Sequence, residues 1–124
     1  MTLTMNAARE DVGTAAERAA AGAKWLDGIK TNWFRLIKVN NLDEGSGVDC
    51  VLAQVTKQPF TMALEWFSVQ LELSLEDPTQ ELELLERAVD YGFRMNGTDD
   101  REELSLAWAA EIAARRERKS QPQE

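Results

Sequence analysis

The stretch "EDPTQELELLERAVDYGF", residues 76–93, contains the signals for both the start and the end of a helix. Asp77 is a typical N-cap residue, because its carboxylate can accept hydrogen bonds from the backbone N–H groups of the first turn, and Pro78 suits the first helical position. At the other end, Gly92 can take the left-handed conformation that closes a helix, with Phe93 folding back as its hydrophobic contact. The stretch therefore predicts a helix that starts at Pro78 and ends just before Gly92.

The apolar residues inside this stretch indicate which side of the helix faces the core. Leu82, Leu85 and Val89 recur at intervals of three and four, with Ala88 beside them, as on one face of an amphipathic helix. Gln80 follows the N-cap at the spacing of a capping box, in which its side chain would bond back to the cap. We expect Leu82, Leu85 and Val89 to be buried.

Two further helices are predicted before the first long loop. Residues 10–30 are rich in alanine, and small or apolar residues recur along them at helical spacing: Ala15, Ala19, Gly22, Leu26 and Ile29. Thr31 and Asn32 can then cap a short helix that carries the next apolar residues: Trp33, Phe34, Leu36 and Ile37. Residues 38–49 are rich in Asn, Gly and Ser, and they predict the main loop.

The segment after the loop predicts a short helix. Asp49 is its expected N-cap, Cys50 its first residue, and Pro59 stops the run. The apolar positions expected to face the core are Val51, Leu52 and Val55.

Residues 60–75 fit two patterns. We favour a helix from Thr61 to about Leu73, because Met, Ala, Leu, Glu and Gln dominate and β-branched residues are few. A strand is the alternative, because apolar and polar residues alternate strictly from residue 69 to residue 75. Such a strand would need a partner, and residues 36–39 are the one weak candidate. The choice between helix and strand stays open for residues 67–75.

A last helix is predicted over residues 99–118. Asp99 and Glu102 stand in capping-box spacing, and an apolar stripe follows them: Leu104, Ala107, Trp108 and Ile112. Together, these patterns predict a mainly α fold, a compact single-domain bundle of about five helices, with or without one short strand pair. Residues 1–119 would form the domain, and residues 120–124 a solvated tail.

Charge is distributed unevenly along the chain. The net charge is −8, from 14 Lys and Arg against 22 Asp and Glu, and residues 58–86 contain no basic residue. Such a segment repels phosphate, so the sequence argues against direct binding of DNA or RNA. We expect the acidic side chains of this segment to attract a basic protein partner: Glu72, Glu76, Asp77, Glu81, Glu83 and Glu86.

The sequence contains no recognisable catalytic or cofactor-binding set. Histidine is absent, which removes Ser-His-Asp and Cys-His sites and nearly every zinc site that uses imidazole. Phosphate-binding glycine motifs are absent, and the loop acids Asp43, Glu44 and Asp49 do not follow the EF-hand pattern. We therefore predict no catalytic residue, no metal and no cofactor. An enzyme that uses carboxylates alone is the weaker alternative.

Cys50 is the single cysteine of the chain. Its apolar neighbours Val48, Val51 and Leu52 favour a buried thiol over a reactive one. A thiol without a partner is typical of a reducing compartment. Since no apolar run reaches the length of a signal peptide or a membrane span, we expect a cytoplasmic protein that does not associate with membranes.

Several residues follow one another in a recognisable order. Trp and Ile come before a Leu-Asp loop, Cys-x-Leu-x-Gln and then Gly-Phe come after it, and a late Trp lies in the terminal helix. The positions here are Trp33, Ile37, Leu42, Asp43, Cys50, Leu52, Gln54, Gly92, Phe93 and Trp108. This order resembles a group of small uncharacterised proteins of actinobacteriophages and their actinobacterial hosts. The resemblance implies that Cys50 and Leu52 fill the core and that Gln54 ties the preceding loop through its amide. The chain departs from the pattern at Ala53, where the group often has Gly, and in a longer acidic stretch near residues 68–76.

These observations favour a non-enzymatic phage accessory protein that binds and modulates a host protein, expected to be basic, through an acidic surface. One alternative is a DNA mimic that inhibits a DNA-binding host enzyme. Mimicry requires carboxylates in a continuous stripe, whereas scattered acids merely keep a small domain soluble. A minor virion component is the other alternative, and the oligomeric state stays open.

Overall fold

The computed structural model describes residues 12–96 and 101–120, and the chain is mainly α-helical. The elements follow one another in the order α1 (Ala15–Ile29), η1 (Trp33–Leu36), η2 (Val39–Asn41), α2 (Val51–Thr56), α3 (Phe60–Leu71), α4 (Pro78–Asp90) and α5 (Arg101–Ser120), where η marks a short 3₁₀ helix. The predicted helical bundle is confirmed. No strand occurs within these residues, so the additional strand pair does not form.

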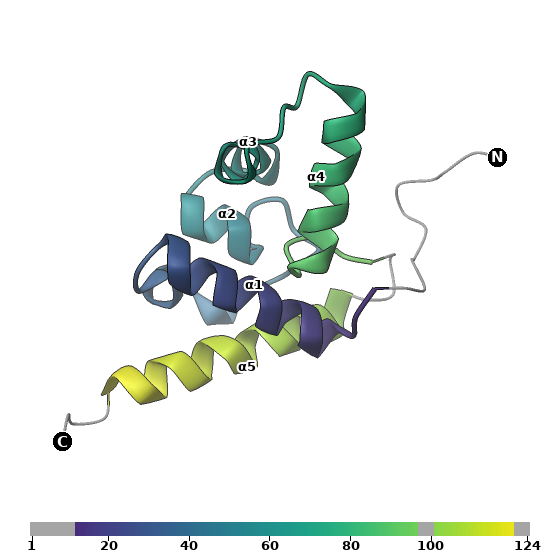
Figure 1. Ribbon diagram of the computed structural model, residues 1–124. Helices are drawn as coiled ribbons and strands as arrows, with labels where there is room; N and C mark the ends of the chain where they lie inside the picture. The colour runs from purple at the N-terminus through teal and green to yellow at the C-terminus, as the bar shows by residue number, and fades with distance from the viewer. Residues whose placement is uncertain (1–11, 97–100, 121–124) are drawn as a thin grey trace.

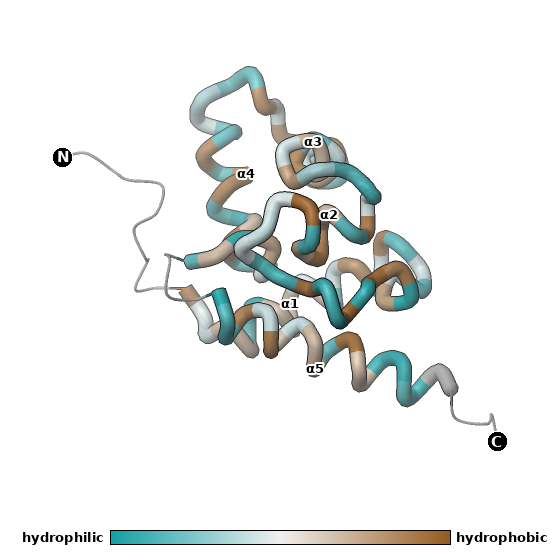
Figure 2. Tube along the Cα trace, turned by 180° about the vertical axis from the view of Figure 1, so that it is seen from behind, coloured by the Kyte–Doolittle hydropathy of each residue, from teal (hydrophilic) through white to brown (hydrophobic). Residues whose placement is uncertain are grey.

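The helices stack in layers from the bottom to the top of Figure 1. α1 and α5 lie side by side at the bottom, α2 lies above α1, and α3 packs on α2. α4 stands beside this stack, and its lower end contacts α1. Figure 2 shows the same order from behind, with the connection from α3 to α4 at the top.

α1 begins at Ala15, later than the predicted residue 10. Thr14 is its N-cap: the hydroxyl accepts a hydrogen bond from the Glu17 N–H at 3.1 Å, and the Glu17 carboxylate accepts one from the Thr14 N–H at 2.9 Å. This capping box satisfies N–H groups that have no partner within a helix. Residues 12–14 are not helical, and residues 10 and 11 lie outside the described residues.

The buried face of α1 consists mostly of small residues. All of the predicted face is buried except Ile29, which is 43% exposed at the end of the helix. A Cβ atom on Gly22 would lie 1.9 Å from the Tyr91 carbonyl oxygen and 2.9 Å from the Trp108 ring. Glycine is therefore what allows α1 to approach α5 and the end of α4 so closely.

A buried arginine joins α1 to the end of α4. Arg18 is 3% exposed, and its Nε donates a hydrogen bond to the Val89 carbonyl oxygen at 3.0 Å. Sequence reasoning missed this contact, because the carbonyl partner of Arg18 is 71 residues away along the chain. Burial removes water from the Arg18 guanidinium, and the Val89 carbonyl oxygen takes the place of that water as the hydrogen-bond acceptor.

Aromatic rings fill the space between the layers. Trp108 of α5 stands edge-on to Trp33, with ring centroids 5.7 Å apart, and stacks on Phe93 at 5.6 Å. Its indole N–H donates a hydrogen bond to the Gly92 carbonyl oxygen at 2.6 Å. Phe93 in turn meets Phe67 of α3, with centroids 5.3 Å apart. This series of buried rings connects α5, the end of α4 and α3.

α4 begins where the sequence predicts. The Asp77 carboxylate accepts a hydrogen bond from the Thr79 N–H at 2.9 Å, and Pro78 occupies the first helical position. The Gln80 side-chain oxygen accepts the Ser74 N–H at 2.7 Å rather than the N–H of the cap that a capping box would use. Gln80 thereby holds the connection from α3 to α4.

α4 also ends as predicted, but its buried face differs. Gly92 has a φ of +69°, and the Phe93 N–H bonds back to the Ala88 carbonyl oxygen at 2.8 Å. The prediction that Leu82 is buried is wrong: Leu82 is 43% exposed, whereas Leu84 is fully buried. Leu84 and Ala88 are four residues apart and share a face of the helix, and this is the side that meets the rest of the fold.

Two smaller boundaries differ from the predictions. α3 ends at Leu71 because Glu72 has a left-handed φ of 58°, which lets the Leu73 N–H bond to the Ser68 carbonyl oxygen at 2.9 Å. Before η1, Asn32 has a φ of 61°. Its side chain makes no capping hydrogen bond to η1, so the prediction that this side chain caps the helix is wrong.

The stripe predicted for α5 faces the core. Leu104, Trp108 and Ile112 are fully buried, and Ala107 is half-buried. The helix continues to Ser120, beyond the predicted end. The predicted N-cap at residue 99 lies outside the described residues.

Replacing Gly22 with alanine should destabilise the fold, although alanine is the better helix former. The added carbon would meet the Tyr91 carbonyl oxygen, so α1 would have to move away from its neighbours. We expect the free energy of unfolding to fall by about 2–4 kcal/mol. Denaturant titration followed by tryptophan fluorescence measures the change.

Gly28→Ala is the matched control on the same helix, because its Cβ atom would meet nothing within 4 Å. It should leave the free energy of unfolding unchanged or raise it by up to about 1 kcal/mol. An equal loss of stability in both variants would contradict the packing argument.

Candidate functional site

The segment before α2, residues 43–49, closes on itself through hydrogen bonds. The Asp43 N–H donates to the Asp49 carbonyl oxygen at 3.2 Å, and the Ser46 hydroxyl accepts the Asp49 N–H at 3.1 Å. The Gly47 carbonyl oxygen accepts the N–H of Phe60, the first residue of α3, at 2.7 Å. We call this segment the 43–49 loop.

Two contacts fasten the 43–49 loop to α5. The Asp43 carboxylate accepts two guanidinium N–H groups of Arg101, one of them at 2.7 Å. The Glu44 N–H donates to the Ser105 hydroxyl oxygen at 2.9 Å. Hydrogen bonds from Arg101, and then from the Gly45 N–H, hold the pKa of Asp43 below its usual range.

Gln54 ties the loop to α2, as the resemblance implies. Its side-chain oxygen accepts the Lys38 N–H at 2.6 Å, and its side-chain nitrogen donates to the Asp49 carbonyl oxygen at 2.8 Å. One amide group therefore bonds the backbone at Lys38, ahead of the 43–49 loop, and at Asp49, the last residue of the loop.

Glu44 is buried, with 5% of its surface exposed. Its Oε2 accepts a hydrogen bond at 2.7 Å from the N–H of Val51, the first residue of α2. The prediction that Asp49 is the N-cap is therefore wrong: Cys50 occupies that position without a side-chain bond, and Glu44 satisfies the helix instead. Its other oxygen, Oε1, has no hydrogen-bond partner within the described part of the chain. Burial raises the pKa of Glu44 to about 8 against the lowering effect of the Val51 N–H, and nearby Asp43 adds to the rise.

Cys50 and Leu52 lie in the core beneath the loop, 1% and 0% exposed. Burial raises the pKa of the Cys50 thiol to about 12, and Glu44 adds to the rise. The thiol therefore stays protonated at neutral pH, which argues against a nucleophilic role.

The remaining positions of the resemblance also belong to the scaffold. Trp33 and Ile37 are buried, and Leu42 is half-buried against the core. Gly92, Phe93 and Trp108 form the contact between α4 and α5 described above. The contacts described for these ten positions are therefore contacts that hold the fold together.

The six predicted partner-binding acids are all exposed, and we call them the acidic surface: Glu72, Glu76, Asp77, Glu81, Glu83 and Glu86. The first three lie in the connection from α3 to α4 and the others on α4, at the top and the side of Figure 1. The connection lies at the end of the molecule opposite α5, and α4 runs down from it toward α1.

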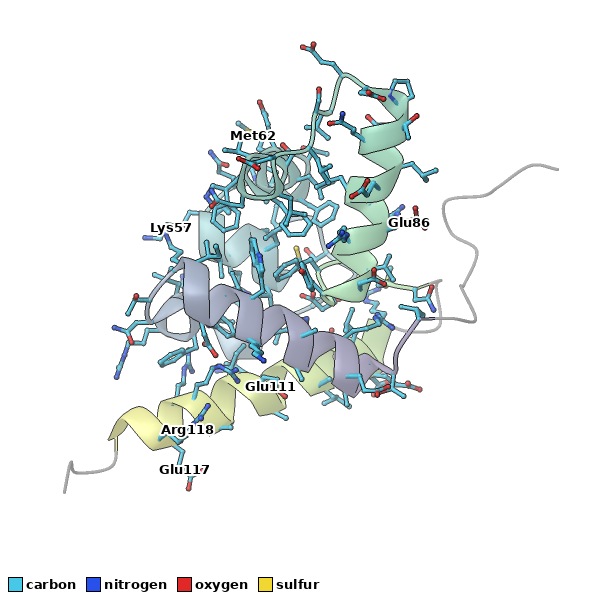
Figure 3. The ribbon with its side chains drawn as sticks, viewed as in Figure 1. Lys57, Met62, Glu86, Glu111, Glu117 and Arg118 are labelled. Atoms are coloured by element: carbon cyan, nitrogen blue, oxygen red, sulfur yellow. The ribbon has the colours of Figure 1, made fainter. Side chains whose placement is uncertain are left out.

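These acids do not form one uniform cluster. Asp77 is engaged as the N-cap of α4, and Glu83 lies 3.7 Å from the Arg87 guanidinium. Glu86 lies farther down α4, on its outer side (Figure 3). Glu72 directly follows the last residue of α3, whereas Glu76 directly precedes Asp77, the N-cap of α4.

Two exposed apolar side chains lie close along the chain to the residues of the acidic surface. Val69, in the last turn of α3, is 68% exposed, and Leu82, in α4, is 43% exposed. They flank the connection from opposite ends. Met62 is 49% exposed and lies in the first turn of α3, on the side of Lys57 (Figure 3).

A hollow of about 520 Å³ opens between η2 and α2. It is lined by Leu36, Lys38, Asn41, Val48, Asp49, Ala53, Gln54, Lys57, Gln58 and Pro59. Asp49 is the one carboxylate of this lining, so the hollow lacks the pair of carboxyl groups that glycoside hydrolysis uses. Across residues 12–96 and 101–120, no three Cys, Asp or Glu residues gather in a way that could hold a metal ion.

Comparisons of the chain with protein-family models, with curated proteins and with solved structures found no match. Among the described helices, none combines the length and the apolar character needed to cross a membrane. Fold and surface together define a small mainly α bundle with an acidic end.

Replacing Gln54 with alanine should destabilise the protein by about 1–3 kcal/mol, because the Lys38 N–H and the Asp49 carbonyl would both lose their partner. Thermal unfolding followed by circular dichroism measures the change. Gln70→Ala, at an exposed position of α3, is the control and should change stability by less than about 0.5 kcal/mol. Equal effects would show that Gln54 does not hold the loop.

Proposed function

We propose that this protein is a non-enzymatic phage accessory protein that binds and modulates a basic host protein in the bacterial cytoplasm through the acidic surface. The observation that carries the proposal is the combination of exposed carboxylates with exposed apolar side chains, since Val69 lies three residues before Glu72 along the chain and Leu82 directly follows Glu81. Carboxylates alone serve solubility. Apolar side chains left in water among them support a surface that another macromolecule covers.

The charge around this surface supports a basic partner. Residues 58–86 contain no Lys or Arg, so no cation within this segment offsets its carboxylates. Such a field reaches about 8–10 Å at physiological salt and speeds the approach of an oppositely charged protein. Val69 and Leu82 would then supply the short-range apolar contact.

The same surface gives less support to a DNA mimic. A mimic of the phosphate backbone presents one negative charge after another along an unbroken line. Here Leu82 stands among the carboxylates of α4, and Glu83 is close to Arg87. Apolar side chains and an ion pair fit contact with the surface of a basic protein better than contact with a groove that binds the phosphates of DNA.

The resemblance to actinobacteriophage proteins supports a host protein as the partner. The positions that carry it lie in the scaffold, so they say nothing of which host protein that is. The absence of histidine and the raised pKa of the Cys50 thiol support a role without catalysis.

Affinity enrichment from an actinobacterial lysate, with the full chain as bait, should recover one dominant basic protein whose binding weakens as salt rises. With that protein purified, Val69→Ser should weaken binding about tenfold, because it removes the most exposed apolar contact. The double variant Glu76→Lys with Glu81→Lys should weaken it at least as much by reversing two charges. Titration calorimetry measures both.

Matched controls come from α5, at the opposite end of the molecule. Leu106 is 65% exposed, so Leu106→Ser makes the same kind of change as Val69→Ser away from the acidic surface. Glu102→Lys with Glu103→Lys makes the same change in net charge. Both should bind normally. Recovery of nothing above background, or equal loss of binding in the α5 variants, would contradict the proposal.

A further inference from the structure

Glu44 combines deep burial with incomplete hydrogen bonding. Its Oε2 accepts the Val51 N–H, while Oε1 is enclosed without a partner among the described residues. The same residue fastens the 43–49 loop to α5, since its own N–H bonds to Ser105. Glu44 therefore sits at the junction between the loop, α2 and α5.

The charged groups around this junction do not favour an ionised Glu44. From the loop itself come Asp43 and Asp49, both carboxylates, and from the start of α2 comes the Cys50 thiol. From α5 comes Arg101, but its guanidinium is bound to the Asp43 carboxylate. A carboxylate at Glu44 would have one backbone N–H as its partner, whereas a neutral carboxyl loses far less by leaving water.

We propose that Glu44 is a pH-sensitive latch, which holds the 43–49 loop against α2 and α5 when it is protonated and releases the loop when it is ionised. The buried oxygen without a partner and the bonds from the same residue to both helices carry this inference. It does not depend on the proposed function.

The direction of the pH dependence follows from proton binding. With the loop closed, the pKa of Glu44 is about 8. With the loop open, the carboxyl is in water and has an ordinary glutamate pKa of about 4.3. Between these values the closed form holds more protons, so closure is favoured in acid and weakens as pH rises. The equilibrium constant for opening should increase by up to about tenfold per pH unit from about pH 5 to about pH 8, and then level off.

Loop opening would uncover Cys50, which lies directly after the loop and is 1% exposed. The thiol can therefore report opening without any function of its own. In the full-length chain, its rate of reaction with dithiodipyridine should be compared between wild type and Glu44→Gln from about pH 5 to about pH 9. Glutamine keeps the acceptor for the Val51 N–H and never ionises.

The ratio of the wild-type rate to the Glu44→Gln rate is the measured quantity, because the pH dependence of the thiol itself cancels at each pH. We expect this ratio to rise by at least about tenfold between about pH 5 and about pH 8 and to be level above that. Asp49→Asn removes a carboxylate from the same loop and should follow wild type. A ratio that does not change with pH would overturn the proposal.

Two further measurements keep the test decisive. Far-UV circular dichroism should show constant helicity over the pH range, and a loss of helicity that parallels thiol exposure would overturn a local latch in favour of unfolding of the whole chain. If Glu44→Gln does not fold, the Glu44 carboxyl carbon of wild type can be titrated by NMR. A midpoint near the ordinary glutamate value, about 4.3, would also overturn the proposal.

Discussion

The close contact between α1, α5 and the end of α4 is the constraint on which the rest of the fold depends. Gly22 leaves the space that the Tyr91 carbonyl and the Trp108 ring occupy. Trp108 then binds the Gly92 carbonyl and stacks on Phe93, which fixes the end of α4. Because α4 is held at this lower end, its other end carries the connection and the acidic surface away from α5. The absence of a side chain at Gly22 thus allows the contact that holds the lower end of α4.

Carboxyl groups play two opposite roles in this molecule. On α4 and the connection before it they are exposed to water, and in the proposed function they attract a basic protein. In the 43–49 loop, Asp43 keeps its charge because Arg101 binds it, whereas burial opposes the charge of Glu44. The difference lies in the surroundings of each group, since burial removes water and a paired guanidinium replaces it.

Two signals account for what could be predicted of the candidate site. The resemblance implies the role of Gln54, whose two bonds reach Lys38 and Asp49. The exposure of the acidic surface follows from carboxylates that have no cation in the same segment. The role of Glu44 was missed, because it caps α2 from seven residues away in place of Asp49, and no capping pattern covers that spacing.

The sequence by itself determined that the chain forms helices and where α4 begins and ends, because Asp77 and Gly92 act on backbone groups within a few residues. Only the tertiary structure decided which sides of those helices are buried. Leu82 and Leu84 both fit an apolar face of α4. Leu84 is the one that is buried, because the neighbouring elements lie on its side of the helix. The burial of Arg18 is decided in the same way, by a carbonyl group that only folding brings near.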